Sequence, residues 1–166
     1  YVSGKTSHGA EPWQGINALE QGFGLLADLR EELMREEHPV LGRSTLQITM
    51  AEGGIAPNMT PDRAQFLADI RIVPPLNEKE VLNRLKCLIE KRCEVYNGGL
   101  SFAPEISNYR MPVETGPKNQ WLHRLKGFIG DDAGETGINY FTDASIFLTA
   151  WPDSPALLFG PGEPQM

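Results

Sequence analysis

Apolar residues along the first 107 positions follow two different repeats, one typical of helices and one typical of strands. Residues 16–33 carry an apolar side chain every three or four positions, which predicts an amphipathic helix with one buried face. Residues 44–52 and 64–73 alternate apolar and polar side chains, which predicts two half-buried strands. The predicted helix stripe consists of Ile16, Leu19, Phe23, Leu26, Leu29 and Leu33.

A second helix is predicted after Pro74-Pro75, which ends the second of these strands. Asn77 is a favourable N-cap, and Glu80 lies at the capping-box position three residues on. Asn97-Gly98-Gly99 ends the helix. With short strands over residues 1–5 and 100–107, the order becomes β-α-β-β-α-β. This order predicts an α+β, ferredoxin-like fold, in which two helices cover one face of an antiparallel sheet.

After Pro112 the pattern changes. It predicts a helix over 118–129, a Gly- and acid-rich loop over 130–137, a second helix ending near residue 148 and a strand over 155–159. These elements resemble part of an incomplete α/β unit. We therefore predict two domains, residues 1–112 and 113–166. Because the first residue is Tyr rather than Met, we expect the chain to be a fragment of a longer protein.

Charge and cysteine content narrow the class of protein. The net charge of -7 argues against a nucleic-acid partner. No apolar run approaches the ~20 residues of a membrane span, and no signal peptide precedes the first strand. Cys87 and Cys93 lie six positions apart in one predicted helix, about 9 Å of rise, which is too far for a disulfide. We expect reduced thiols and a cytoplasmic protein.

Three polar residues are candidates for chemistry, each with an ordinary structural alternative. His8 lies in a Gly-flanked turn, where it could donate a hydrogen bond to an oxyanion or make only a local bond. Arg71 shares a strand face with Asp69, so it could bind a substrate carboxylate or only pair with that neighbour. Asn58 follows two glycines in a loop and could contact a ligand or only form a turn.

Two further segments could line a ligand crevice. Gly160-Pro161-Gly162 follows a predicted strand, where glycine lets a ligand approach the backbone, although a bare turn fits equally well. Thr142 could join the same crevice, while Asp143 next to it alternatively caps the following helix. No metal-binding His or Cys pattern, nucleophile elbow or phosphate-binding loop occurs in the sequence. Read alone, the chain contains no complete active site.

Taken together, five segments resemble the co-catalytic zinc hydrolases, which include acetylornithine deacetylase, succinyl-diaminopimelate desuccinylase, carboxypeptidase G and the aminoacylases. The first three are similar to the lid, or dimerisation, domain of that family and the last two to its C-terminal catalytic segments. They are Gly4 to Pro12 followed by Gly15-Ile16-Asn17-Ala18; Gly53-Gly54 with Pro57-Asn58 and Pro61; Asp69-x-Arg71 with Pro74; Tyr140-x-Thr142-Asp143-Ala144; and Gly160-Pro161-Gly162.

The resemblance implies a parent enzyme with two zinc ions, or cobalt or manganese in their place, that hydrolyses an N-acyl-amino acid or a dipeptide. It implies a homodimer formed through the lid domain, in which His8 stabilises the oxyanion in the partner's site. Asn58 and Arg71 would hold the carboxylate end of the substrate. Thr142 and the Gly160-Pro161-Gly162 backbone would line the pocket.

The same resemblance implies what this chain lacks. The family's His-x-Asp motif and its bridging carboxylates lie in an N-terminal half that is not present, and its last His ligand follows the Gly-Pro-Gly segment. We therefore expect no zinc in this chain and no activity from it alone. The alternative hypothesis is a non-catalytic ferredoxin-like module for oligomerisation or small-ligand sensing, because one fold supports many functions.

Overall fold

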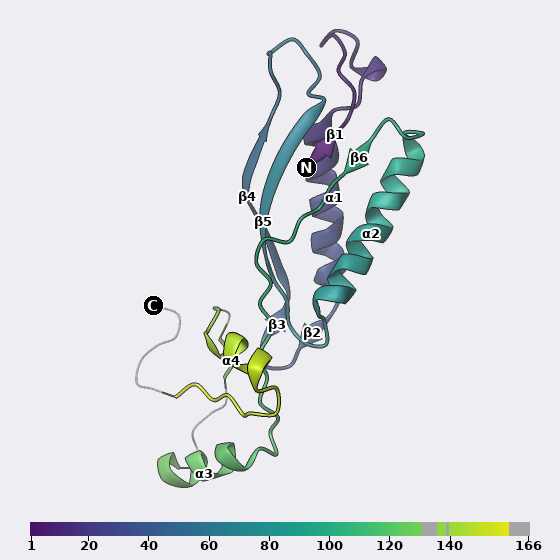
Figure 1. The fold of residues 1–166 in the computed structure, drawn as a ribbon. Coiled ribbons are helices and arrows are strands. Elements are labelled where there is room, and N and C mark those ends of the chain that lie inside the picture. The colour runs from purple at the N-terminus through teal and green to yellow at the C-terminus, as the bar shows by residue number, and fades with distance from the viewer. Residues whose placement is uncertain (131–135, 139, 160–166) are drawn as a thin grey trace.

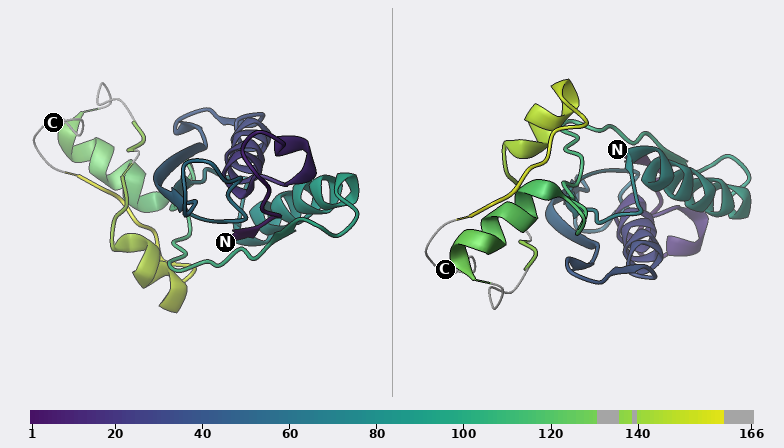
Figure 2. Two further views of the ribbon diagram at one scale, coloured as in Figure 1. Left: turned by 90° about the horizontal axis from the view of Figure 1, so that it is seen from above. Right: turned by 90° about the horizontal axis from the view of Figure 1, so that it is seen from below.

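The computed structural model describes residues 1–130, 136–138 and 140–159. Its main sheet contains β1 (Val2–Ser3), β4 (Thr45–Gly53), β5 (Arg63–Arg71) and β6 (Ser101–Phe102), in the order β4-β5-β1-β6 with every pair antiparallel. Helices α1 (Ala18–Leu33) and α2 (Glu78–Val95) lie side by side on one face of this sheet (Figures 1 and 2). The ferredoxin-like prediction is confirmed.

Helix α1 begins two residues after the first position of the predicted stripe, and most of that stripe faces the core, with Phe23 as the exception. The Asn17 side chain caps the helix by accepting hydrogen bonds from the amides of Leu19 and Glu20. Phe23 was expected in the core and is 46% exposed. The helix turns Gly22 toward β5 instead, because the Phe66 ring occupies the space that a side chain there would fill. The residues that α1 buries are Ala18, Gly22, Leu25, Leu29 and Leu33.

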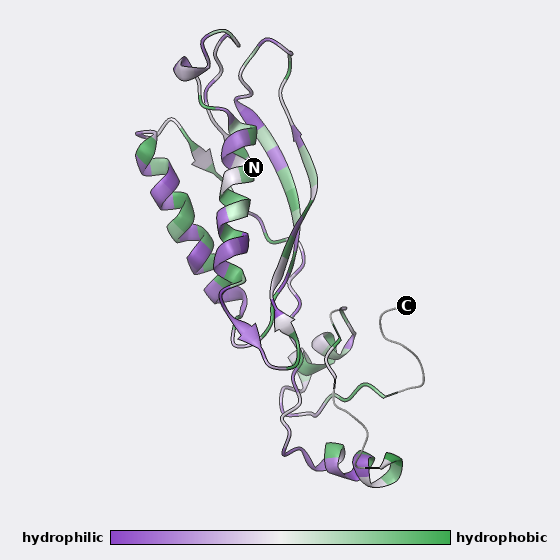
Figure 3. Ribbon diagram, turned by 180° about the vertical axis from the view of Figure 1, so that it is seen from behind, coloured by the Kyte–Doolittle hydropathy of each residue, from purple (hydrophilic) through white to green (hydrophobic). Residues whose placement is uncertain are grey.

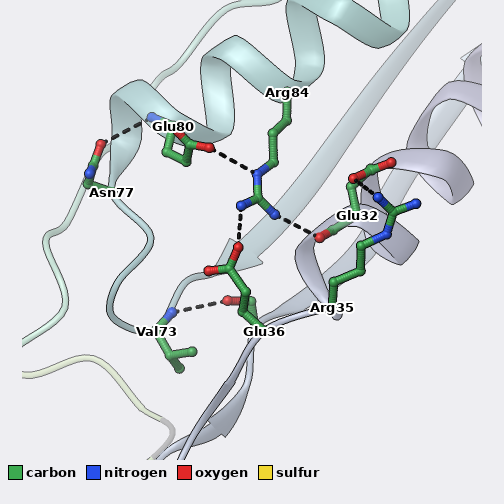
Figure 4. A network of polar contacts seen from close by, with 8 residues as sticks. Glu32, Arg35, Glu36, Val73, Asn77, Glu80 and Arg84 are labelled. Carbon is green, nitrogen blue, oxygen red and sulfur yellow. Dashed lines mark hydrogen bonds and ion pairs between the residues drawn. The ribbon is translucent and has the colours of Figure 1, made fainter.

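Charged contacts hold α2 against α1. The Arg84 guanidinium donates to the main-chain oxygen of Glu32 at 2.9 Å and pairs with Glu36 and Glu80 (Figure 4). Hydrophilic and hydrophobic residues are interspersed along both helices, as expected for partly exposed amphipathic helices (Figure 3). At the start of α2, Asn77 accepts the Glu80 amide at 3.1 Å, which confirms the predicted cap.

Asn97 and Gly98 follow α2 with φ angles of 47° and 83°. This left-handed turn ends the helix as predicted. Cys87 and Cys93 both lie on α2 and are free thiols, also as predicted.

Strand lengths differ from the sequence-based expectation. The strands expected over 1–5 and 100–107 shorten to β1 and β6, since Lys5 pairs with Ile16 outside the sheet and Pro104 has no amide proton to donate to a ladder. An unexpected two-strand ribbon, β2 (Glu37–His38) with β3 (Gly42–Arg43), follows α1.

The described part of the C-terminal segment contains the helices α3 (Gln120–Ile129) and α4 (Ala144–Ala150). A three-residue 3-10 helix, η1 (Pro12–Gln14), lies near the N-terminus, before α1. The strand expected over 155–159 is wrong: this stretch is irregular, and the Thr115 hydroxyl bonds both the amide and the carbonyl of Ala156 in place of a neighbouring strand. None of the described helices is both long and apolar enough to span a membrane.

Candidate functional site

Two loops meet at one end of the sheet and bring His8 next to Asn58. We call this region the tip (residues 6–10 and 56–60). The Gly9 amide donates to the Asn58 carbonyl at 2.8 Å, and the Thr60 amide donates to the Ser7 carbonyl at 2.9 Å. A side-chain hydrogen bond of 2.8 Å between the Ser7 and Thr60 hydroxyls also links the two loops. Both residues that motif reasoning selected from these loops are therefore neighbours in space.

His8 is exposed and carries a defined hydrogen-bonding pattern. Its Nδ1 accepts the Ala10 amide at 3.1 Å, so the proton of the neutral ring lies on Nε2. Among the described residues nothing accepts a hydrogen bond from Nε2. The Asn58 side chain is exposed as well, because only its backbone takes part in the loop pairing. The tip thus offers an imidazole N–H and an amide to a molecule outside this chain.

Arg71 lies far from the tip, at the opposite end of β5. Eight residue steps separate Arg63, next to the tip, from Arg71, which corresponds to about 27 Å of extended strand. The Arg71 Nε and Nη2 donate to the two carboxylate oxygens of Asp69 at 2.8 Å each. This hydrogen bonding raises the pKa of Arg71 above its ordinary value, in opposition to a smaller effect of desolvation.

Arg71 and Thr142 line the same cleft, although they come from different parts of the chain. The cleft has a volume of about 1870 Å³ and extends along both faces of the sheet, from α1 and α2 on one face to Asp69 and Arg71 on the other, and along the chain after β6. Arg110 also lines it, with its guanidinium 5.2 Å from the centre of the Phe141 ring. The Thr142 carbonyl accepts hydrogen bonds from the amide and the hydroxyl of Ser145, the second residue of α4.

Asp143 occupies the N-cap position of α4, but its side chain makes no capping hydrogen bond, so the capping alternative for this residue is wrong. Gly160, Pro161 and Gly162 lie outside the described residues. Four of the predicted site residues thus fall into two separate groups, His8 with Asn58 at the tip and Arg71 with Thr142 in the cleft.

The described residues do not fit a dinuclear metal centre. Within residues 1–130, 136–138 and 140–159, no three His, Cys, Asp or Glu side chains come together in a way that could hold a metal ion. The residues placed at the tip and in the cleft offer hydrogen-bonding and charged groups to a ligand.

Sequence reasoning missed two contributions to these regions. The hydroxyl pair of Ser7 and Thr60 fixes the tip, and Arg110 adds a guanidinium to the cleft besides those of Arg43 and Arg71. The hydrophobic pattern and the short motifs of the sequence indicate neither the Ser7–Thr60 pair nor the position of Arg110. Ser7 and Thr60 are 53 positions apart, and Arg110 lies in an irregular stretch without periodicity, so only the folded chain shows their places.

Comparisons with known proteins agree on the kind of fold. The family model of the M20 peptidase dimerisation domain matches residues 1–97. Acetylornithine deacetylase of Pasteurella multocida is 26% identical over 170 aligned positions, which cover 97% of this chain and 42% of that protein.

Two solved structures share the fold. A putative aminohydrolase from methicillin-resistant Staphylococcus aureus superposes with a TM-score of 0.67 at 16% identity, over 90% of this chain and 39% of that chain. Aminopeptidase PepT from Bacillus cereus superposes with a TM-score of 0.61 at 20% identity, over 93% and 40%. The chain spans about two fifths of the length of these relatives.

Proposed function

This chain belongs to the M20 family of peptidase dimerisation domains, and we propose that it serves as the lid and dimer-forming part of a hydrolase. In this proposal residues 1–112 form the lid, and residues 113–166 belong to the catalytic domain. The bond cleaved is the amide of an N-acyl-amino acid or a dipeptide. The names of the relatives, a deacetylase, an aminohydrolase and an aminopeptidase, support amide hydrolysis as the class of reaction.

The observation that carries the proposal is the separation of the two groups of polar residues. An N-acyl-amino acid is much shorter than the ~27 Å between the two ends of β5, so it cannot contact both groups of one chain. The C-terminal segment with α3 and α4 lies at the Arg71 end, away from the tip (Figure 1). In a two-fold symmetric dimer, the tip of one chain can instead complete the cleft of the other.

Each group then has a chemical role in a composite site. In the cleft, Arg71 binds the substrate carboxylate by charge-assisted hydrogen bonds, with Thr142 beside it. From the partner, His8 donates its Nε2 proton to the oxyanion that develops on the scissile carbonyl. Asn58, which lies beside His8 rather than Arg71, contributes its amide from the same side. In this respect the proposal departs from the motif resemblance, which implies that Asn58 and Arg71 both hold the carboxylate end of the substrate.

An available sheet edge supports the homodimer. Strand β4 has nine residues and pairs only with β5 in the part of the chain that the structure describes, so its other edge presents backbone donors and acceptors. Such an edge is a template for a strand from a second copy. Zinc is the metal that the motif resemblance implies for the whole enzyme, but since the described residues do not fit such a centre, the roles above involve only side chains of this chain.

Mixed dimers of the complete enzyme, meaning this chain together with its adjoining coding sequence, test the proposal. His8→Ala and Arg71→Ala subunits are co-expressed with different affinity tags, and the heterodimer is isolated. The assay measures hydrolysis of N-acyl-amino acids and dipeptides, beginning with N-acetylornithine. A composite site leaves one intact site in each heterodimer, so we expect about half of the wild-type activity, against near-zero activity in both mutant homodimers.

Two outcomes contradict the proposal in different ways. A heterodimer as inactive as the homodimers would show that His8 and Arg71 act within one chain, because every site would then lack one of them. A wild-type protein that hydrolyses no member of the panel would overturn the enzyme function and favour the non-catalytic module. Arg43→Ala serves as the matched control, since Arg43 is a second paired arginine that lines the same cleft.

A further inference from the structure

The pair formed by Asp69 and Arg71 has a geometry that constrains how Arg71 can bind a ligand. The two residues are two positions apart on β5, so their side chains leave the same face of the sheet. Both line the cleft. Two parallel hydrogen bonds of 2.8 Å, from Nε to Oδ1 and from Nη2 to Oδ2, hold the guanidinium against the carboxylate. The guanidinium is thus fixed in two directions rather than attracted at one point.

These two bonds leave a defined part of the guanidinium unoccupied. Arginine has five N–H donors, and Asp69 takes one on Nε and one on Nη2. Both protons of Nη1 and the second proton of Nη2 remain. Nη1 and Nη2 together form an edge that matches the two oxygens of a carboxylate. On the adjacent strand, Thr45 lies opposite Arg71 and Gln47 lies opposite Asp69, so β4 places no second carboxylate across from the pair.

We propose that Asp69 is a positioning residue, which orients Arg71 so that a ligand carboxylate in the cleft binds the Nη1–Nη2 edge and not the Nε edge. The inference rests on the carboxylate-binding role that the proposed function gives to Arg71. An arginine side chain loses conformational freedom when it binds. Asp69 removes part of that freedom before the ligand arrives, so the pair is a preorganised receptor rather than a closed surface ion pair.

The test uses acetate as the probe and the whole 166-residue chain labelled with nitrogen-15. Nuclear magnetic resonance follows the Nε and Nη signals of Arg71 during titration with sodium acetate, with sodium chloride added to keep the ionic strength constant. We expect acetate to shift the Nη signals of Arg71 and to leave its Nε signal in place, because Asp69 occupies Nε.

Two variants separate orientation from charge. Asp69→Asn and Asp69→Ala both remove the negative charge, but asparagine keeps one oxygen that can accept from Nε. We expect acetate to bind the alanine variant about threefold more weakly than the asparagine variant, and to shift Nε in the alanine variant only. Glu37→Ala is the matched control, since it releases Arg43 from a similar exposed pair and leaves the pair on β5 intact. Unchanged backbone amide spectra establish that each variant is folded.

Three results would overturn the inference. They are an Nε signal that moves together with Nη in the wild-type chain, equal acetate affinity of the two Asp69 variants, and the absence of any acetate-dependent shift at Arg71. The last result also removes the carboxylate role of Arg71. The hydrolytic function is tested independently, because the substrate panel and the mixed dimers measure turnover and not anion binding.

Discussion

Gly22→Ala tests the packing of α1 on the sheet. Gly22 is buried, and a Cβ atom at this position would lie 2.0, 2.5 and 2.8 Å from three carbon atoms of the Phe66 ring. Real Cβ atoms do not approach this closely, so the ring has to move. The ring has little room, because it packs edge-on against Phe23 with the ring centres 5.0 Å apart and the planes at 84°.

The expected size follows from two opposing effects. Replacing glycine by alanine inside a helix stabilises it by about 1 kcal/mol, whereas an extra methyl group in a filled space costs about 1–3 kcal/mol. Since three ring atoms are too close, we take the upper part of that range and expect a net loss of roughly 1–2 kcal/mol in the free energy of unfolding. For a chain of this size the melting temperature then falls by about 2–8 °C.

Urea and thermal unfolding followed by circular dichroism measure the effect. Gly127→Ala on α3 is the control, because nothing lies within 4 Å of the new Cβ there, so we expect no loss of stability. Phe66→Leu removes the ring and should cancel most of the Gly22→Ala penalty in the double variant. A Gly22→Ala chain as stable as the wild type, or a penalty that persists without the ring, would refute this account of the packing.

Three further predictions concern polar contacts. Asn77→Ala should lower the free energy of unfolding by about 1 kcal/mol, because the Glu80 amide loses its cap, while Asn77→Ser should stay close to wild type in the same urea titration. Ser44→Ala should cost about 1–3 kcal/mol by calorimetry, since the buried Ser44 hydroxyl accepts the Val73 amide at 3.1 Å, and a chain that melts unchanged would contradict this. The loss caused by Arg84→Ala should be equal at about pH 7 and about pH 10: hydrogen bonding to the Glu36 carboxylate raises the pKa of Arg84 above its ordinary value, and stability from a raised pKa is lost only when the pH rises through that pKa, which lies well above pH 10. Urea midpoints at the two pH values check this, and a penalty that disappears at the higher pH would be inconsistent with it.

Local patterns were sufficient for the β-α-β-β-α-β order of the main elements in residues 1–107, for the α+β class and for the family. Helix periodicity and the Asn77 cap depend on residues within four positions of each other, so they can be read from the chain directly. The family was identified correctly from short motifs in the right order. The dimerisation-domain model matches residues 1–97, which contain the first three of these motifs. Such features need no knowledge of distant contacts.

Strand lengths and the exact buried stripe required the folded chain. A strand ends where its partner ends, so residues 100–107 retain only Ser101–Phe102 opposite the short β1. Phe23 and Gly22 are neighbours in the helix, and the choice between them depends on Phe66, which is more than forty positions away. Periodicity defines a helical face to within one residue, and tertiary packing decides which residue of that face is buried.

The candidate site shows the same division. Motifs selected His8, Asn58, Arg71 and Thr142 by residue type and spacing. The fold then placed His8 beside Asn58 through backbone pairing of their loops, and Arg71 with Thr142 in one cleft about 27 Å along β5 from the tip. Contacts between residues far apart in the chain depend on sheet order and register, and these are properties of the assembled fold. For this reason the amino-acid sequence indicated which side chains are candidates for binding and catalysis. Only the three-dimensional structure showed that they lie at two different ends of the molecule.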